Sequence, residues 1–242
     1  MMDDQWAWVL LLAIVVVLIA VGVASYQAEK RRKEQLSAVA SRLGFEFWPE
    51  SQPQLVESLT YFHLFSRGHS KKAWNVIDGR TGDVKVQLFD YKYVTGGGKS
   101  SQTWRQMVIL FESSRLRLPA FSLRPQGFWD KIAGAFGQQD IEFEANPDFS
   151  AAYLIQGQDE DQVRAIFPEP VIAYCTRHPG LCVEGNGEQL IYYRKAQRVE
   201  PAEIQDFFQE GLDVLDLWIQ KEGVADNLDL IGLDLGGALP LS

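Results

Sequence analysis

Trp6–Ala24, WAWVLLLAIVVVLIAVGVA, is a run of nineteen consecutive residues without a charged side chain. A helix that crosses a hydrocarbon core of about 30 Å needs roughly 20 apolar residues, because each residue adds about 1.5 Å. Inside lipid every backbone N–H and C=O must be paired within the segment, so a lone span forms a helix. The sequence therefore predicts a transmembrane helix over residues 6–26.

Aromatic residues stand at both ends of this span, where amphipathic rings favour the level of the lipid headgroups. Trp6, Trp8 and Tyr26 are the predicted membrane anchors. The alternative is a cleaved signal peptide, which begins with a basic region and has a shorter apolar core. Here the leading charges belong to Asp3 and Asp4 and the apolar run is long, so we expect the segment to be retained.

Four consecutive cations, Lys30, Arg31, Arg32 and Lys33, follow the span. Cations beside a span stay in the cytoplasm, so these four are the predicted topology signal. They predict a single-pass signal anchor in the inner (cytoplasmic) membrane, with a short extracytoplasmic N-terminus (residues 1–5) and the rest of the chain in the cytoplasm. Recognition of anionic lipid is the alternative role for the same cations.

The remaining chain is predicted to divide into three parts. Apolar residues recur at helical spacing over Leu36–Leu43, and Gly44 favours a helix C-cap. We therefore expect the membrane helix to continue as a basic juxtamembrane stalk over residues 27–44. A cytoplasmic domain is expected over residues 45–223, and an acidic, leucine-rich tail over residues 224–242.

Composition supports a folded domain and argues against nucleic-acid binding. The 242 residues are 46% hydrophobic and 12% aromatic, which is enough to bury a sizeable core. The formal net charge is −9, and residues 200–242 hold ten Asp or Glu against one Lys. Beyond the juxtamembrane cations no basic stretch stands out, so nucleic acid is not an expected partner.

Alternating apolar residues predict three strands over residues 73–77, 83–94 and 104–112. In the second strand the alternation changes phase near Phe89, which indicates either a bulge or a strand covered on both faces.

Further hairpins are predicted over residues 140–155 and 181–195, with helices over residues 159–167, 171–176 and 201–219. The predicted fold class is α+β, in which an N-terminal transmembrane helix precedes antiparallel β hairpins with helices packed mainly on one face. Two lobes with a boundary near residues 125–140 are an open alternative.

Residues 96–100, GGGKS, resemble a phosphate-binding loop in composition but not in spacing. The phosphate-binding motif needs Gly where this chain has Tyr93, and it needs a helix rather than a strand after the lysine. We expect a flexible hairpin loop instead, exposed as a contact loop for a partner. The contact loop consists of Gly96, Gly97, Gly98 and Lys99.

No metal, cofactor or catalytic site is predicted. Cys175 and Cys182, with His178 between them, supply three ligands at no standard spacing, and His63 and His69 lack further ligands nearby. In a reducing cytoplasm the two cysteines are expected to be buried thiols.

Three stretches carry a resemblance to a known family: Phe89–Tyr93 (FDYKY), Leu118–Pro125 (LPAFSLRP) and Val183–Gly187 (VEGNG). The chain resembles a family of uncharacterised bacterial proteins that have one N-terminal span and a cytoplasmic α+β domain of unknown function. The resemblance covers nearly the whole chain. It implies the fold and the anchor, but no activity.

Two functions from different classes follow. The first is a non-enzymatic binding or scaffold domain at the cytoplasmic membrane face, with the lipid bilayer and a protein or small ligand as partners. It is favoured because no catalytic constellation stands out. The alternative is a membrane-bound hydrolase that uses Asp90, His63 or Glu184, which would need converging polar groups in a well-formed pocket.

Overall fold

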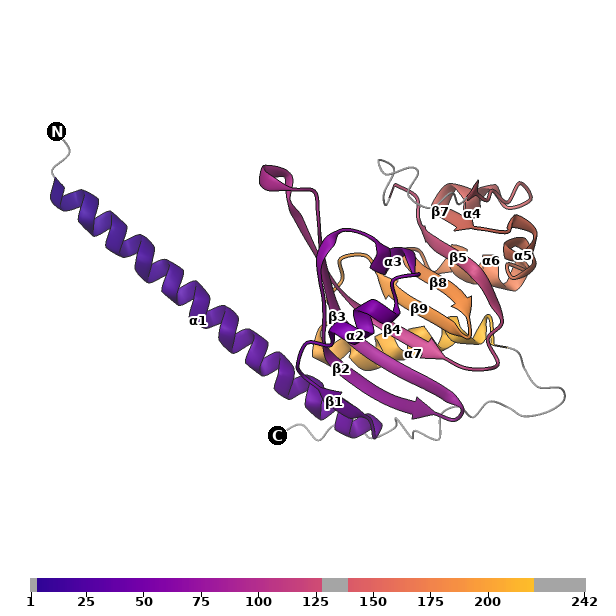
Figure 1. The fold of residues 1–242 in the computed structure, drawn as a ribbon, viewed down its shortest axis with the longest axis horizontal. Helices are drawn as coiled ribbons and strands as arrows, with labels where there is room; N and C mark the ends of the chain where they lie inside the picture. The colour runs from indigo at the N-terminus through magenta and orange to yellow at the C-terminus, as the bar shows by residue number, and fades with distance from the viewer. Residues whose placement is uncertain (1–3, 128–138, 220–242) are drawn as a thin grey trace.

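The protein is described by a computed structural model that covers residues 4–127 and 139–219. The predicted tail over residues 224–242 and the first three residues lie outside this range. Helix α1 (Asp4–Leu43) runs without a break through both the predicted span and the predicted stalk. Its apolar half projects away from the folded domain (Figure 1).

Helix α1 is long and apolar enough to cross a membrane. Within Trp8–Leu43, the most apolar 18-residue window has a mean hydropathy of 2.9, and none of that window is buried inside the protein. The core helix of a soluble protein would be covered by its own fold, and this segment is not. The N-terminal helix thus has the character of a membrane anchor.

After α1 the described chain forms nine strands and several short helices. The strands are β1 (Glu46–Trp48), β2 (His69–Thr81), β3 (Val84–Thr95), β4 (Gln102–Glu112), β5 (Leu118–Pro125), β6 (Gln139–Asp140), β7 (Tyr153–Gly157), β8 (Leu181–Gly187) and β9 (Gln189–Arg194). The helices are α2 (Pro53–Ser58), α3 (His63–Ser66), α4 (Pro147–Ala152), α5 (Glu160–Ala165), α6 (Glu169–Arg177) and α7 (Ile204–Asp216), with 3₁₀ turns at Gly98–Ser100 and Pro201–Glu203.

All nine strands belong to one antiparallel sheet with the order β1-β2-β3-β4-β9-β8-β5-β7-β6. The α+β class predicted from the sequence is confirmed. Part of the lobe boundary expected near residues 125–140 lies outside the described residues. On either side of it, β5 pairs directly with β7 and β8 in the same sheet.

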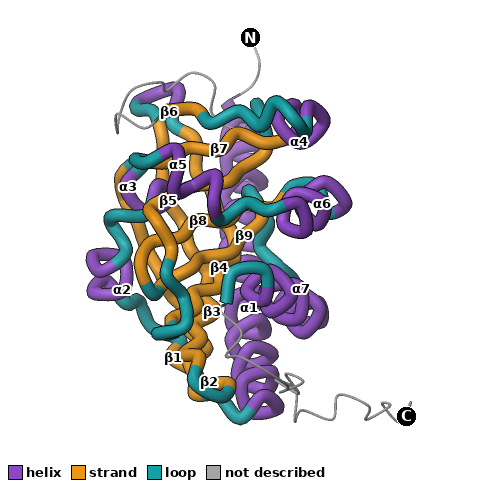
Figure 2. Tube along the Cα trace, turned by 90° about the vertical axis from the view of Figure 1, so that its right-hand side faces the viewer, coloured by secondary structure: helices purple, strands orange, loops and turns teal. Residues whose placement is uncertain are grey.

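Most helices pack on one face of the sheet, as Figure 2 shows for α1, α4, α6 and α7. We call this face the anchor face, because the docked part of α1 lies on it. Its apolar cluster draws on α1, α4, α6 and α7 and also on Val163 of α5. The opposite face, which we call the tyrosine face, is covered by α2 and α3 and includes Tyr91, Tyr93 and Tyr193.

The phase change in β3 comes from coverage on both faces. Val84, Val86 and Leu88 belong to the cluster on the anchor face, whereas Phe89 and Tyr91 belong to the tyrosine face. The pairing of β3 with β4 is continuous over its whole length.

The irregularity lies in the neighbouring strand β2. There the register shifts between Trp74 and Ile77, and Asn75 adopts a positive φ of 53°. A residue with a short polar side chain tolerates this left-handed conformation better than most.

One predicted hairpin differs from the structure. Residues 140–155 do not form two strands joined directly, because the segment between β6 and β7 contains helix α4. Pro147 occupies the first turn of that helix, where its missing N–H costs nothing, and Phe149 buries its ring in the core.

Candidate functional site

A buried ion pair joins α1 to the sheet. The guanidinium of Arg32 donates from Nε and Nη2 to Oδ2 and Oδ1 of Asp90, at 3.0 and 2.8 Å. Its Nη1 donates to the carbonyl oxygen of Val199 at 2.8 Å. Arg32 is 6% exposed and Asp90 is 0% exposed. Because a bidentate pair fixes both distance and orientation, it sets the rotation of α1 about its axis against the sheet.

A second arginine completes this cluster. Arg198 donates to Oδ2 of Asp90 at 3.0 Å and to both carboxylate oxygens of Glu29 at 2.5 and 2.8 Å. Asn75, at the irregular point of β2, donates to Oδ2 of Asp90 at 2.9 Å. We call Glu29, Arg32, Asn75, Asp90 and Arg198 the anchor junction.

The electrostatics of the junction favour the charged carboxylate. Burial alone raises the pKa of Asp90, but hydrogen bonds from Arg32 and Arg198 outweigh it, so the pKa lies below its ordinary value. The hydrogen bond from Arg198 likewise lowers the pKa of Glu29. The junction is therefore charged and paired at neutral pH.

The four predicted topology cations have different surroundings. Arg32 is buried in the junction, whereas Lys30 and Arg31 are exposed. Lys33 lies 3.6 Å from the carboxylate of Glu50. The run of cations thus includes a structural contact that its position beside the span does not reveal. The clue in the sequence is an ionisable residue, Asp90, between the aromatic residues Phe89 and Tyr91 of β3.

The predicted membrane anchors all lie in α1. Trp8 and Tyr26 are 71% and 72% exposed, so neither ring packs against the folded domain. Trp6 belongs to the same helix, but its side chain lies outside the described part of the structure.

Glu184 forms a separate buried cluster on the tyrosine face. Its Oε1 accepts a hydrogen bond from the hydroxyl of Tyr193 at 2.9 Å, and its two oxygens lie 3.1 and 3.3 Å from the backbone nitrogen of Leu64, which donates to them. Burial raises the pKa of Glu184 to about 7, although these hydrogen bonds act in the opposite direction. Burial thus favours the protonated form of this carboxyl more than in an exposed Glu.

His63 lies on the same face beside an arginine. Nη1 of Arg124 lies 2.7 Å from Nε2 of the His63 ring, and Nη2 donates to Oε1 of Gln156. Burial, together with the charges of Arg124 and Arg67, lowers the pKa of His63 to about 3. The ring is therefore neutral at pH 7 and is too weak a base for efficient proton abstraction at that pH.

The three residues of the hydrolase alternative do not share one pocket. Asp90 points to the anchor face, where two arginines and an asparagine occupy its carboxylate. Glu184 and the residues around it belong to the tyrosine face. The sheet separates the two groups, because alternate residues of a strand point to opposite faces.

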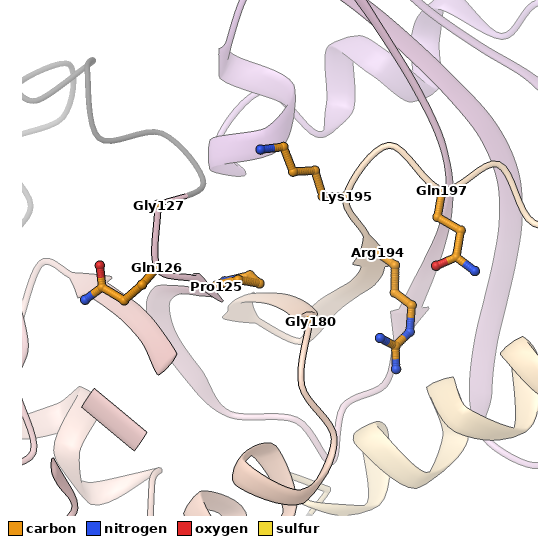
Figure 3. Close-up of a pocket in the computed structure, with 7 residues that line it drawn as sticks. All are labelled: Pro125, Gln126, Gly127, Gly180, Arg194, Lys195 and Gln197. Atoms are coloured by element: carbon orange, nitrogen blue, oxygen red, sulfur yellow. The ribbon is translucent and has the colours of Figure 1, made fainter. Parts of the chain in front are cut away.

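The surface near the end of β9 is hollowed. One cavity of about 340 Å³ is shown in Figure 3, and it is lined by Pro125, Gln126, Gly127, Gly180, Arg194, Lys195 and Gln197. A neighbouring cavity of about 580 Å³ shares Arg194 and Gln197 and reaches the acidic face of α7. Arg194 points toward α7 in the figure, and its guanidinium pairs there with Glu210. The cation is thus engaged within the protein itself.

The contact loop lies at the end of the β3–β4 hairpin. All four of its residues are exposed. The strand expected after it is confirmed as β4, so the loop lacks the helix that a phosphate-binding loop requires. Its role as a contact surface stays a prediction.

Within residues 4–127 and 139–219, no group of three or more His, Cys, Asp or Glu side chains is placed to hold a metal ion. Cys175 and Cys182 are both buried and carry free thiols. Burial raises the pKa of Cys175 to about 12. Such thiols are poor nucleophiles and poor metal ligands at neutral pH.

The fold and the junction define an antiparallel α+β domain attached to an N-terminal helix that has the character of a membrane anchor. No protein-family model matches the sequence, and no curated protein matches it. The fold is similar to the crystal structure of the mycobacterial trehalose monomycolate transport factor A, TtfA, with a TM-score of 0.57 and 12% sequence identity. The match covers 79% of this chain and 98% of that chain. At this identity the similarity concerns the fold alone.

Proposed function

We propose that the protein is a single-pass protein of the inner membrane, with its N-terminus outside and its domain in the cytoplasm. The apolar half of α1 supplies the span. The exposed cations Lys30 and Arg31, which immediately follow it, favour the cytoplasmic side.

We further propose that the domain is a non-enzymatic binding or scaffold domain held at the membrane face. The observation that carries this proposal is the anchor junction, because buried, paired charges hold the sheet at a fixed angle to the membrane helix. A domain held in this way presents its surfaces at a constant height above the bilayer. The similarity of fold to a protein named as a transport factor agrees with a membrane-associated role.

The topology is tested with a reporter fused after Ser242 in intact cells. We expect the reporter to be inaccessible from outside and to become accessible when the membrane is permeabilised. Labelling of the reporter in intact cells would refute the proposed orientation.

The binding role is tested by lysine-directed crosslinking in native membranes, followed by mass spectrometry. We expect a reproducible protein neighbour. Lys99→Arg is a matched variant that keeps the charge of the contact loop but removes its reactive amine, so it reports whether that loop touches the neighbour. Absence of any neighbour, together with measurable turnover in a substrate screen, would favour the hydrolase alternative instead.

A further inference from the structure

Three cations lie side by side across the sheet next to the anchor junction. Lys72 on β2 pairs in register with Lys92 on β3, and Lys92 pairs with Arg105 on β4. We call these three residues the cation row. Cross-strand partners share a face of the sheet. The row lies two residues from Asp90 along β3, so it shares the anchor face with α1.

The row has no carboxylate partner in the described part of the chain. Each Asp or Glu that forms an ion pair there does so with another cation. Lys72 and Arg105 are exposed and Lys92 is half-buried. Residues 67–77 and 91–106, which form this end of the three strands, contain six Lys or Arg and no Asp or Glu. In a chain of net charge −9, this is a marked separation of charge.

The row lies toward the membrane side of the domain. Phe45, just after α1, lies against Gly79, whose partner on β3 is Val86. Earlier in α1, Arg32 reaches Asp90, which is four residues further along β3. Moving along α1 toward its apolar half therefore means moving along β3 toward the contact loop. Figure 1 shows this end of the hairpin on the same side of the domain as the apolar half of α1.

The row lies close to the end of the predicted span. Lys92 lies about 7 Å beyond Asp90, because a strand rises about 3.3 Å per residue. The same distance along a helix takes about four or five residues, at about 1.5 Å each. Because Arg32 contacts Asp90, the row lies no further than this from Arg32 along α1, on the side of Tyr26.

We propose that the cation row binds the anionic headgroups of the bilayer that holds α1. This proposal rests on the membrane anchorage proposed above. A group of cations just cytoplasmic of a span is the usual electrostatic partner of anionic lipid. Here the fold assembles such a group from three strands that are distant in sequence from the juxtamembrane cations.

The test uses the full chain in nanodiscs of neutral phosphatidylcholine and in nanodiscs that also contain phosphatidylglycerol. Lysine acetylation rates are measured by mass spectrometry. We expect Lys72 and Lys92 to react more slowly in the anionic nanodiscs, and we expect Lys85, at the other end of β3, to react equally in both. Salt at 1 M should remove the difference, because it shortens the screening length to about 3 Å.

A matched pair of variants assigns the effect to the row. Each cation near an anionic surface contributes a factor of about five to attachment. Arg105→Gln should therefore reduce the protection of Lys72 and Lys92 about fivefold. Arg117→Gln, which removes another exposed arginine outside the row, should leave that protection unchanged.

The outcomes separate this proposal from the anchorage. Failure of the chain to enter nanodiscs would overturn both. Entry without a lipid-dependent difference, an equal loss of protection in the two variants, or equal protection by inorganic phosphate with neutral nanodiscs would overturn the cation row alone.

Discussion

Replacing Asp90 with Asn tests the anchor junction. The substitution keeps the shape of the side chain but removes the charge that Arg32 and Arg198 share. Removing one member of a buried pair costs about 3–5 kcal/mol, because the remaining charge is left buried without a partner. Arg198 keeps Glu29 and Arg32 keeps the carbonyl of Val199, so we expect a loss near the lower limit, about 3 kcal/mol.

The assay is urea unfolding of the full chain in nanodiscs, followed by tryptophan fluorescence. Glu50→Gln is the matched control, because it removes an exposed carboxylate that also pairs with a cation of α1. It should change the free energy of unfolding by less than about 1 kcal/mol.

The cost of Asp90→Asn should also depend on pH. The native pKa of Asp90 lies below the ordinary value of 3.8, so its stabilisation is complete above that value and is lost as the pH falls through the lower native pKa. If Asp90→Asn were no more destabilising than Glu50→Gln at pH 7, the junction would not hold α1 against the sheet.

Three further predictions concern other parts of the molecule. The native pKa of Glu184 is about 7, whereas its ordinary value, taken for the unfolded chain, is 4.5. Between these two pH values only the native state retains the proton. The carboxyl of Glu184 therefore destabilises the native state more as the pH rises. The free energy of unfolding of Glu184→Gln, measured with urea, should therefore rise by about 3 kcal/mol relative to that of the wild type between pH 4 and pH 8. A difference between the two proteins that does not change with pH would contradict this. Gly79→Ala should destabilise by about 1–3 kcal/mol in the same measurement, because its Cβ would overlap the ring of Phe45. Gly97→Ala, whose Cβ meets no atom within 4 Å, should be neutral, and equal effects of the two changes would argue against the packing at the end of α1. Alkylation without reductant should modify neither cysteine in the native protein and both after unfolding, and a mass shift on the native protein would show that a thiol is accessible.

Local patterns predicted much of the fold. The uncharged run over residues 6–24 is an unambiguous helix signal, because length and apolarity act within one segment. The strands β2, β3 and β4 follow from alternation along single stretches of chain. The phase change at Phe89 also carried information, since it marked a strand that is buried on both faces.

The anchor junction could not be predicted in the same way. Arg32 and Asp90 are separated by 58 residues, and Arg198 lies 108 residues beyond Asp90. Local periodicity describes residues close together in sequence, so it cannot predict a contact between residues this far apart. The position of the charge run beside the span explains its exposed members but not the buried Arg32. The available clue is an acid, Asp90, between the buried aromatic residues Phe89 and Tyr91.

The hydrolase alternative fails to assemble for a related reason. A sequence pattern does not say which face of a sheet a polar residue occupies until the neighbouring strands are known. In the structure Asp90 and Glu184 face opposite sides of one sheet. The cation row is equally invisible in sequence, because its three members meet only through strand register.

The most direct test of membrane anchorage is alkaline carbonate extraction of native membranes without detergent, with the full-length chain followed by immunoblot. We expect the whole chain to remain in the membrane pellet, because an uncovered apolar helix has no stable place in water. Recovery of the full-length chain in the supernatant would contradict the anchorage on which the proposed function rests.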